Sequence, residues 1–152
     1  RMCLRTHCQP ILKELSEMGC KIIGDKIIKK IFSGKLKIAQ TSDWNTEYLS
    51  PTISVKCVDG VEDAIKHVNF YGTSHTDSII TKNKKTAAKF LNNVKSSISI
   101  HNASTQFADG GEFGFGAEVG ISTEKMPPRG PVGLEQLTTY KYIVEGKGQI
   151  RK

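Results

Sequence analysis

The chain has 152 residues, of which 38% are hydrophobic and 24% are charged, a balance typical of a folded globular protein rather than a disordered segment. No apolar run approaches the ~20 residues that a helix needs to cross a bilayer, which excludes helical membrane spans. No basic stretch followed by an apolar stretch opens the sequence, so we expect a cytoplasmic protein.

The formal net charge is +7, which raises the question of nucleic-acid binding. The lysines are scattered, and the densest group, at residues 82–85, precedes a predicted helix. No aromatic residues are interleaved with basic ones in a stripe. We therefore interpret the surplus as solvated surface and expect no nucleic-acid partner, although a basic nucleic-acid-binding protein stays open as the alternative that rests on charge.

The first third of the chain predicts two helices and two strands. Apolar residues recur at helical spacing over 9–18, and Pro10 suits the first turn of that helix. A short strand over 20–23 follows. The run at 25–32 fits a short amphipathic helix, and a further strand is plausible over 35–40.

The middle third predicts a regular alternation of strands and helices. Strands are expected within 52–58, within 75–81 and over 97–100, and helices over 61–71 and 84–94. This order is typical of a parallel sheet with right-handed crossovers. We therefore predict an α/β fold with a parallel three-layer αβα sheet, whose ligands bind beyond the carboxyl ends of the strands.

A glycine-rich run at 102–137 follows the last of these strands. So many glycines lose much backbone entropy on ordering, which indicates positive φ angles or a close approach to a ligand or strand. The stretch at 110–116, GGEFGFG, superficially matches the glycine pattern of dinucleotide-binding loops. It is not followed by a convincing helix, so as a dinucleotide motif it is weak.

The runs NASTQFADGGEFGFGAEVGIST (102–123) and RGPVGLEQLTTYKYIVEGKGQIR (129–151) resemble the C-terminal end of the gamma-glutamyl phosphate reductases. These enzymes are also called glutamate-5-semialdehyde dehydrogenases and belong to the aldehyde dehydrogenase superfamily. The resemblance extends through 46–81 and reaches back to about Pro10. It covers most of this chain and would cover only the last third or so of a full-length reductase.

The resemblance implies how the chain is organised and what it does. Residues 1–137 would form part of an aldehyde-dehydrogenase-like catalytic domain, and residues 138–152 an oligomerisation tail. The family uses NADPH to reduce gamma-glutamyl phosphate in proline biosynthesis. Its nucleophilic cysteine would lie upstream of this chain, so we expect the isolated chain to be inactive and to work, if at all, with a separate N-terminal segment.

Four cysteines are present: Cys3, Cys8, Cys20 and Cys57. None forms a CxxC pair or has a histidine at metal-ligand spacing, so we expect reduced thiols and no metal site. The opening RMCLRTHC lacks the pattern that follows the family's nucleophile, and Cys3 and Cys8 lie too close to the first helix to be that residue. Cys20 and Cys57 fall in or beside predicted strands and are expected to be small buried hydrophobes.

The resemblance also suggests binding residues, each with a structural alternative. Glu47 falls where the superfamily binds the ribose of the cofactor, and it could equally be a surface residue of a loop. Asn102, Ser104 and Thr105 lie where the substrate would rest, or they cap turns. Arg129 could bind a carboxylate or phosphate, or form an intramolecular ion pair.

The sequence departs from the family pattern at three places. Gln106 stands where the family usually has arginine, and glutamine cannot supply the charge that an anionic substrate favours. Ser50–Pro51 and Pro127–Pro128 are further departures. Together these changes suggest a diverged copy of the reductase.

The last residues predict a short helix over Gly133–Thr139 and an exposed strand or ragged hairpin over Tyr140–Ile150. A strand with an open edge tends to find a partner. The family resemblance implies pairing with another subunit, so we expect a homo-oligomer formed through Tyr140–Ile150. The alternatives are pairing within the domain, or a non-catalytic remnant that only self-associates.

Overall fold

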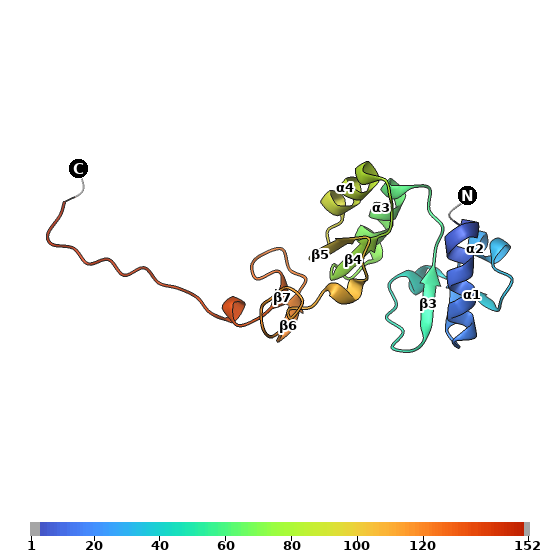
Figure 1. The fold of residues 1–152 in the computed structure, drawn as a ribbon, viewed down its shortest axis with the longest axis horizontal. Helices are drawn as coiled ribbons and strands as arrows, with labels where there is room; N and C mark the ends of the chain where they lie inside the picture. The colour runs from blue at the N-terminus through green and yellow to red at the C-terminus, as the bar shows by residue number, and fades with distance from the viewer. Residues whose placement is uncertain (1–3, 151–152) are drawn as a thin grey trace.

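The structure is a computed structural model and describes residues 4–150 (Figure 1). Its first part confirms the predicted order of helices and strands. A short π-helix, Leu4–Cys8, leads into α1, and a strand, a helix and two strands follow. These elements are α1 (Gln9–Glu17), β1 (Lys21–Gly24), α2 (Lys26–Ile31), β2 (Leu36–Ile38) and β3 (Thr52–Val55).

The second part alternates helices and strands as predicted. Its elements are α3 (Val61–Tyr71), β4 (Thr76–Ile79), α4 (Lys84–Asn93) and β5 (Ile98–His101). Gly60 precedes α3 with a φ of 91°, a conformation that favours glycine over any residue with a side chain. Within residues 4–150, no helix is long and apolar enough to cross a membrane.

The first five strands pair only in parallel, which confirms the predicted α/β class. They form one sheet of order β2-β1-β3 and a second sheet of β4 and β5. The sequence predicts one continuous sheet, whereas in residues 4–150 no strand pairing joins β3 to β4.

Helices α1 and α2 cover one face of the three-stranded sheet. Leu12 of α1, Ile22 of β1, Ile28 of α2 and Phe32 just after α2 form a buried cluster, and Ile28 is 0% exposed. Burying each such side chain stabilises the fold by roughly 1.5–3 kcal/mol. This cluster explains why the apolar spacing of residues 9–18 correctly predicts a helix.

Asp25 connects the sheet to α2. Its Oδ1 accepts hydrogen bonds from the backbone N–H groups of Ile27 at 2.9 Å and Ile28 at 2.8 Å, which caps the first turn of α2. Its Oδ2 accepts a third from the backbone N–H of Cys57 at 2.8 Å, just after β3. One carboxylate therefore ties together the ends of β1 and β3 and the start of α2.

The opposite face of this sheet is covered by a loop. Ile23 and Ser54 pair in the parallel register and therefore point to the face away from Ile22. Ser54 Oγ donates to the carbonyl of Asp43 at 2.8 Å, in the 3₁₀ helix η2 (Thr41–Trp44). The segment between β2 and β3 thus crosses the face that α1 and α2 leave open.

Helices α3 and α4 pack on each other and on β4. Ile65 of α3, together with Phe90 of α4 and the adjacent Val94, forms a second buried cluster, against which Ile79 of β4 packs. Asn83 caps α4 by accepting a hydrogen bond from the backbone N–H of Thr86 at 3.0 Å. Each parallel sheet therefore has its own apolar core.

The glycine-rich segment contains a hairpin that the sequence pattern did not predict. Antiparallel strands β6 (Gly120–Ser122) and β7 (Gly130–Val132) follow the 3₁₀ helix η3 (Thr105–Phe107). Glycine and proline are depleted in strands, so GIS and GPV carry no strand signal. Of the short helix expected over Gly133–Thr139, only the 3₁₀ turn η4 (Glu135–Leu137) forms.

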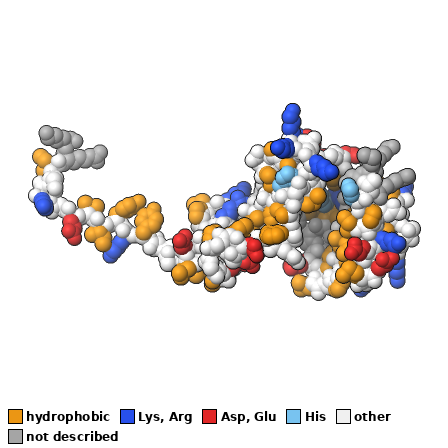
Figure 2. Space-filling model, in the orientation of Figure 1, with side chains coloured by type: hydrophobic (Ala, Val, Ile, Leu, Met, Phe, Trp, Pro, Cys, Tyr) orange, Lys and Arg blue, Asp and Glu red, His pale blue; other side chains and the backbone are white. Residues whose placement is uncertain are grey.

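The end of the chain departs from the expected strand or hairpin. Residues 140–150 contain no strand and extend away from the body of the molecule (Figure 1). Figure 2 shows apolar side chains along this tail with nothing covering them. The tail has no strand beside it in the described chain, so its backbone groups have no ladder to join. The pairing of this segment with another subunit stays a prediction.

Candidate functional site

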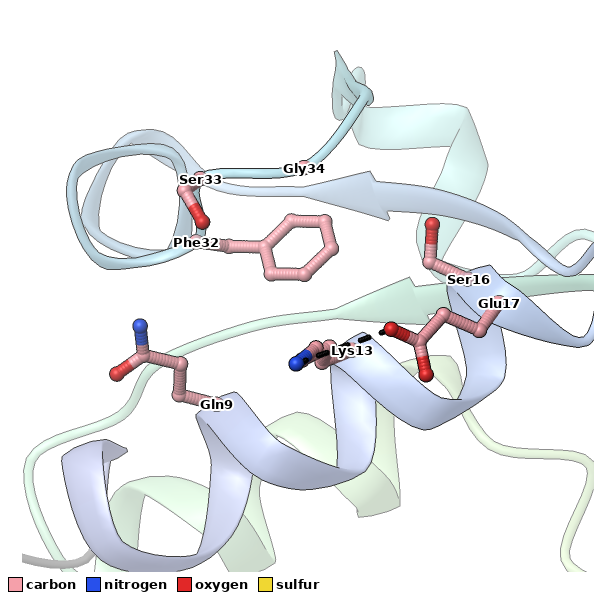
Figure 3. A pocket seen from close by; sticks show the side chains of 7 residues that line it. All are labelled: Gln9, Lys13, Ser16, Glu17, Phe32, Ser33 and Gly34. Carbon is pink, nitrogen blue, oxygen red and sulfur yellow. Dashed lines mark ion pairs between the residues drawn. The ribbon is translucent and has the colours of Figure 1, made fainter.

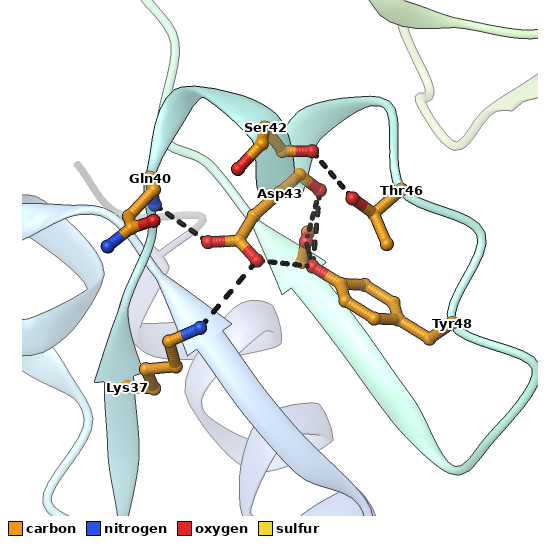
Figure 4. A network of polar contacts seen from close by, with 7 residues as sticks. Lys37, Gln40, Ser42, Asp43, Thr46 and Tyr48 are labelled. Atoms are coloured by element: carbon orange, nitrogen blue, oxygen red, sulfur yellow. Dashed lines mark hydrogen bonds and ion pairs between the residues drawn. The ribbon is translucent and has the colours of Figure 1, made fainter.

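The loop between β2 and β3 is held by a network around Asp43 (Figure 4). Asp43 is only 8% exposed. Its Oδ2 accepts from the backbone N–H of Gln40 at 2.7 Å, and its Oδ1 accepts from the Tyr48 hydroxyl at 3.1 Å. Lys37 Nζ lies 3.9 Å from Oδ1, and the Tyr48 and Ser54 hydroxyls are 2.7 Å apart. The loop is therefore an ordered element.

These contacts shift the pKa values of Asp43 and Tyr48. The pKa of Asp43 is lowered, chiefly because the backbone N–H of Gln40 binds the carboxylate. Desolvation opposes this effect, and Tyr48 and Lys37 lower the pKa further. The pKa of Tyr48 is raised by desolvation, with a smaller effect of the Asp43 charge. Asp43 therefore stays ionised and Tyr48 neutral at ordinary pH.

Glu47 lies between the two anchored residues Trp44 and Tyr48, and its side chain is exposed. Leu49, two positions on, has a φ of 48° and is 89% exposed. An apolar side chain with positive φ is uncommon, and such strain is characteristic of sites that meet a ligand. The network thus presents an acidic and an apolar side chain from one rigid loop beside the amino end of β3.

Asn102 already makes hydrogen bonds with both groups of its side-chain amide. Its Oδ1 accepts from the backbone N–H of Thr81 at 2.8 Å, and its Nδ2 donates to the Thr81 carbonyl at 3.0 Å. The residue has a φ of 57°, in the left-handed region that asparagine tolerates. These contacts agree with the structural alternative for Asn102, in which its side chain caps a turn. A substrate would have to compete with Thr81 for the same groups.

Ser104 and Thr105 begin the turn after β5. Ser104 Oγ accepts from the backbone N–H of Gln106 at 3.2 Å and caps η3. Thr105 is exposed at the start of η3. A cavity of about 290 Å³ lies beside them, lined by Gln106, Phe107 and Glu112. Among the described residues that line this cavity, Glu112 alone is charged, and its negative charge does not favour an anion.

Arg129 lies apart from these residues, just before β7. Its guanidinium donates to the backbone carbonyl of Lys95. Among the described residues, Arg129 forms no ion pair, so a contact with a backbone carbonyl stands in place of the intramolecular ion pair given as its alternative. The predicted residues therefore fall into three groups: Glu47, residues 102–105 and Arg129.

The glycine-rich loop is shaped by its own contacts. The backbone N–H of Gly110 donates to Glu118 Oε2 at 2.8 Å, and the N–H of Gly111 donates to Asp109 Oδ1 at 2.6 Å. Gly114 and Gly116 have φ angles of 80° and 76°. The segment continues into β6, a strand, whereas a dinucleotide-binding loop leads into a helix whose amino end binds phosphate.

The thiol of Cys57 is not activated. Burial, reinforced by the negative charges of Asp25 and Asp59, raises the pKa of the Cys57 thiol. Cys8, Cys20 and Cys57 are half-buried and pair in no disulfide. No group of three or more His, Cys, Asp or Glu side chains in this part of the chain could hold a metal ion. Cys3 lies outside the described residues.

A second cavity, of about 290 Å³, lies between α1 and the end of α2 (Figure 3). Phe32 forms one wall, and Lys13 and Glu17, one turn apart on α1, form an ion pair at 3.8 Å on the other side. Since those two charges compensate each other and none of the predicted site residues lines this cavity, we assign it no role.

No protein-family model matches the chain. Among curated proteins, the gamma-glutamyl phosphate reductase of Methylobacterium radiotolerans is 54% identical over 151 residues, which are 99% of this chain and 35% of that protein. This chain is a homologue of the gamma-glutamyl phosphate reductases. The reductase of Parvibaculum lavamentivorans is 53% identical over 149 residues. The chain spans about a third of the length of the curated relatives it matches.

Solved structures agree. A crystal structure of the gamma-glutamyl phosphate reductase from Thermotoga maritima matches the whole chain with a TM-score of 0.93 and 41% identity, over 36% of that structure. The reductase from Saccharomyces cerevisiae matches 72% of the chain with a TM-score of 0.50 and 29% identity, over 29% of its structure. The resemblance seen in the sequence is confirmed, and so is the α/β fold.

Replacing Asp43 with asparagine tests whether the charged network holds the loop. Folding lowers the pKa of this carboxyl, so its ionised form stabilises the folded state. That stability is fully present above the pKa of the unfolded state, about 3.9, and is lost as the pH falls through the pKa of the folded state. We expect Asp43→Asn to lower the urea midpoint at neutral pH and to reduce the loss of stability below about pH 4. Glu124→Gln, at an exposed loop position, should leave both unchanged. An Asp43→Asn chain with the pH dependence of the parent would contradict this account.

Proposed function

We propose that the chain is the C-terminal segment of an NADPH-dependent gamma-glutamyl phosphate reductase, the glutamate-5-semialdehyde dehydrogenase of proline biosynthesis. The observation that supports this best is the 54% identity to a gamma-glutamyl phosphate reductase across 99% of the chain. Identity at that level across 99% of the chain favours the same role over a different role on the same fold. The segment contributes binding surface and does not turn over alone.

NADPH would supply the hydride for this reduction. The residue that suits it here is Glu47, whose exposed carboxylate can accept hydrogen bonds from two ribose hydroxyls. Its loop is already ordered by Asp43 and Tyr48, so binding costs little further backbone entropy. The glycine-rich loop does not suit the pyrophosphate, because it leads into β6 and lacks a helix amino end. A complete cofactor site therefore needs residues beyond this chain.

The substrate would meet the turn after β5. Ser104 and Thr105 would bind its polar groups, and Asn102 would support the turn through its hydrogen bonds with Thr81. Arg129 would contribute a bidentate donor only after leaving the Lys95 carbonyl. Gln106 lines the neighbouring cavity together with Glu112 and offers no positive charge. This departure weakens binding of an anionic substrate relative to a chain with arginine there.

The covalent step needs a thiolate that attacks the acyl group and expels phosphate. Cys57 is unsuited to this, since its pKa is raised, and Cys8 and Cys20 pack against the first apolar cluster. The nucleophile is therefore expected from outside this segment.

An assay of NADP-dependent oxidation of glutamate semialdehyde in phosphate buffer, with this chain alone, tests the expectation of inactivity. We expect no turnover, because the nucleophile is expected from outside this segment and the cofactor site is incomplete within it. Turnover that is lost on Cys3→Ser or Cys8→Ser substitution would show that the nucleophile lies within this chain.

Self-association through the tail is a second role that a specific observation favours. Tyr140, Tyr142, Ile143 and Val144 are exposed by 74–91%. Such a run exposes apolar area that a folded protein normally covers, and its backbone is extended, ready to pair as a strand. We propose that the tail joins a copy of this chain in a homo-oligomer.

Light scattering on the chain with and without residues 140–152 tests this role. We expect the parent to have a multiple of the monomer mass and the shortened chain to be monomeric, since burial of the exposed tyrosine and β-branched side chains drives the association. The matched control is a Lys141→Ser, Lys147→Ser chain, which loses charge but keeps the apolar residues and should associate as the parent does. The same number of chains per particle before and after the deletion would refute the proposal.

A further inference from the structure

Four side chains meet where the loop between β2 and β3 contacts α3. Trp44 ends η2, and Lys56 directly follows β3. His67 and Tyr71 lie one turn apart on α3. The ring centroids of Trp44 and His67 are 5.6 Å apart, and those of His67 and Tyr71 are 4.8 Å apart. These four residues, the His67 cluster, therefore connect the loop of the first sheet with the helix that precedes β4.

The ammonium group of Lys56 lies among the rings of this cluster. Its Nζ is 5.5 Å from the centre of the Trp44 ring and 5.9 Å from the centre of the Tyr71 ring, within the ~6 Å range of a cation–π interaction. It also lies 3.1 Å from Nδ1 of His67. A lysine ammonium only donates hydrogen bonds, so Nδ1 accepts, and the ring proton of a neutral His67 is on Nε2. The cluster therefore fits a neutral imidazole.

Protonation of His67 puts a second positive charge beside that of Lys56. Nδ1 then becomes a donor that faces another donor, and the two like charges repel each other. Trp44, the contact from the side of η2, carries no charge that could compensate. Among the described residues, no acid pairs with His67 or Lys56, and Asp63, one turn earlier on α3, forms an ion pair with Lys66 instead.

The contacts of His67 depend on its protonation state. Burial, reinforced by the charge of Lys56, lowers the pKa of His67 below its usual value of about 6.5. Surroundings that lower this pKa favour the neutral ring, so by linkage the uptake of a proton weakens the same contacts. The stability that they provide is fully present above about pH 6.5 and is lost as the pH falls through the lower pKa of the folded state.

Trp44 connects the His67 cluster to the loop that displays Glu47. It directly follows Asp43, whose buried carboxylate and carbonyl are bonded to groups of β2, β3 and the loop itself. Glu47 lies three positions further along the chain. The Asp43 network thus holds the loop on the side of the sheet, and the His67 cluster holds it on the side of α3. Loss of the second contact loosens the segment that carries Glu47.

We propose that His67 is a positioning residue, which fastens this loop to α3 while its ring is neutral and releases the loop when the ring takes up a proton. Lys56, whose side chain is exposed, then turns toward solvent. If Glu47 binds the ribose, the cofactor binds more weakly below about pH 6.5. This consequence rests on the proposed function, whereas the pH-dependent contact is a property of the chain itself.

The fluorescence of Trp44 tests the proposal, because Trp44 is the single tryptophan of the chain. An imidazolium in contact with an indole ring quenches its fluorescence more strongly than a neutral imidazole does. We expect the emission to change between about pH 8 and about pH 5, with a midpoint below 6.5. His67→Asn keeps a hydrogen-bond acceptor without a titrating ring and should abolish this change. His101→Asn removes an imidazole bonded to the Thr81 carbonyl at the end of β5, and should titrate as the parent does.

Replacing Lys56 with methionine tests the role of its ammonium group. Methionine keeps an unbranched side chain and removes the charge, so the midpoint should rise toward 6.5. Because Lys56 is exposed, this variant should fold as the parent does, which thermal melting can verify. A Trp44 signal that is flat over this pH range, that still titrates in His67→Asn, or whose midpoint is the same in Lys56→Met would overturn the proposal.

Amide hydrogen exchange measures the release of the loop. The N–H groups of Asp43 and Asn45 bond to carbonyls of the loop at 3.0 Å and 3.4 Å. Corrected for the intrinsic rate at each pH, their protection should fall below the midpoint in the parent and stay constant in His67→Asn. The N–H of Cys57, which is bonded to Asp25, should stay protected in both chains. Protection of the loop amides that does not change with pH in the parent would contradict the release.

These measurements use the chain alone and no cofactor, so they separate this inference from the proposed function. A Trp44 signal that titrates through His67, in a chain that gives no turnover together with the unmatched part of the Methylobacterium radiotolerans reductase, would support the inference and count against the proposed function. Turnover in that mixture without a titrating Trp44 signal would do the reverse.

Discussion

The carboxylate of Asp25 fixes the frame on which the rest of this chain depends. It accepts three backbone hydrogen bonds, two from the first turn of α2 and one from Cys57 after β3. Charge-assisted bonds of this kind are about twice as strong as neutral ones. They hold the carboxyl ends of β1 and β3 side by side. They also fix the first turn of α2 at the position from which Ile28 packs in the core. The loop that crosses the other face of the sheet can then be set against a rigid surface.

That loop is held by a network of polar contacts around Asp43. Asp43 is buried, ionised and bound from four directions, and it holds the segment that displays Glu47 and the strained Leu49. The turn after β5 displays Ser104 and Thr105 in a similar way, with Asn102 fastened to Thr81 behind it. We propose that Glu47, Ser104 and Thr105 bind the cofactor and the substrate, and that the reactive thiol comes from elsewhere in the reductase.

Sequence periodicity predicts the helices and parallel strands well, because their apolar residues face local cores such as the one around Ile28. It fails where the structure depends on contacts between residues that follow no sequence period, or on segments with low strand propensity. The β6–β7 hairpin is built from GIS and GPV, which have low strand propensity, and the Asp43 network joins Lys37, Tyr48 and Ser54, whose spacing in the sequence follows no period. The expected strand at Tyr140–Ile150 does not form, since a strand needs a neighbour. Of the predicted site residues, Glu47 and Thr105 are exposed, while Asn102 and Arg129 are bonded to backbone groups of the chain.

We propose that this chain is a working part of a gamma-glutamyl phosphate reductase. The most direct measurement is NADP-dependent oxidation of glutamate semialdehyde by an equimolar mixture of this chain and the unmatched part of the Methylobacterium radiotolerans reductase. We expect turnover in the mixture and none in either part, with a rise on Gln106→Arg and a fall on Glu47→Gln. A stable complex with no turnover, even with arginine at position 106, would contradict it and identify the chain as a binding remnant.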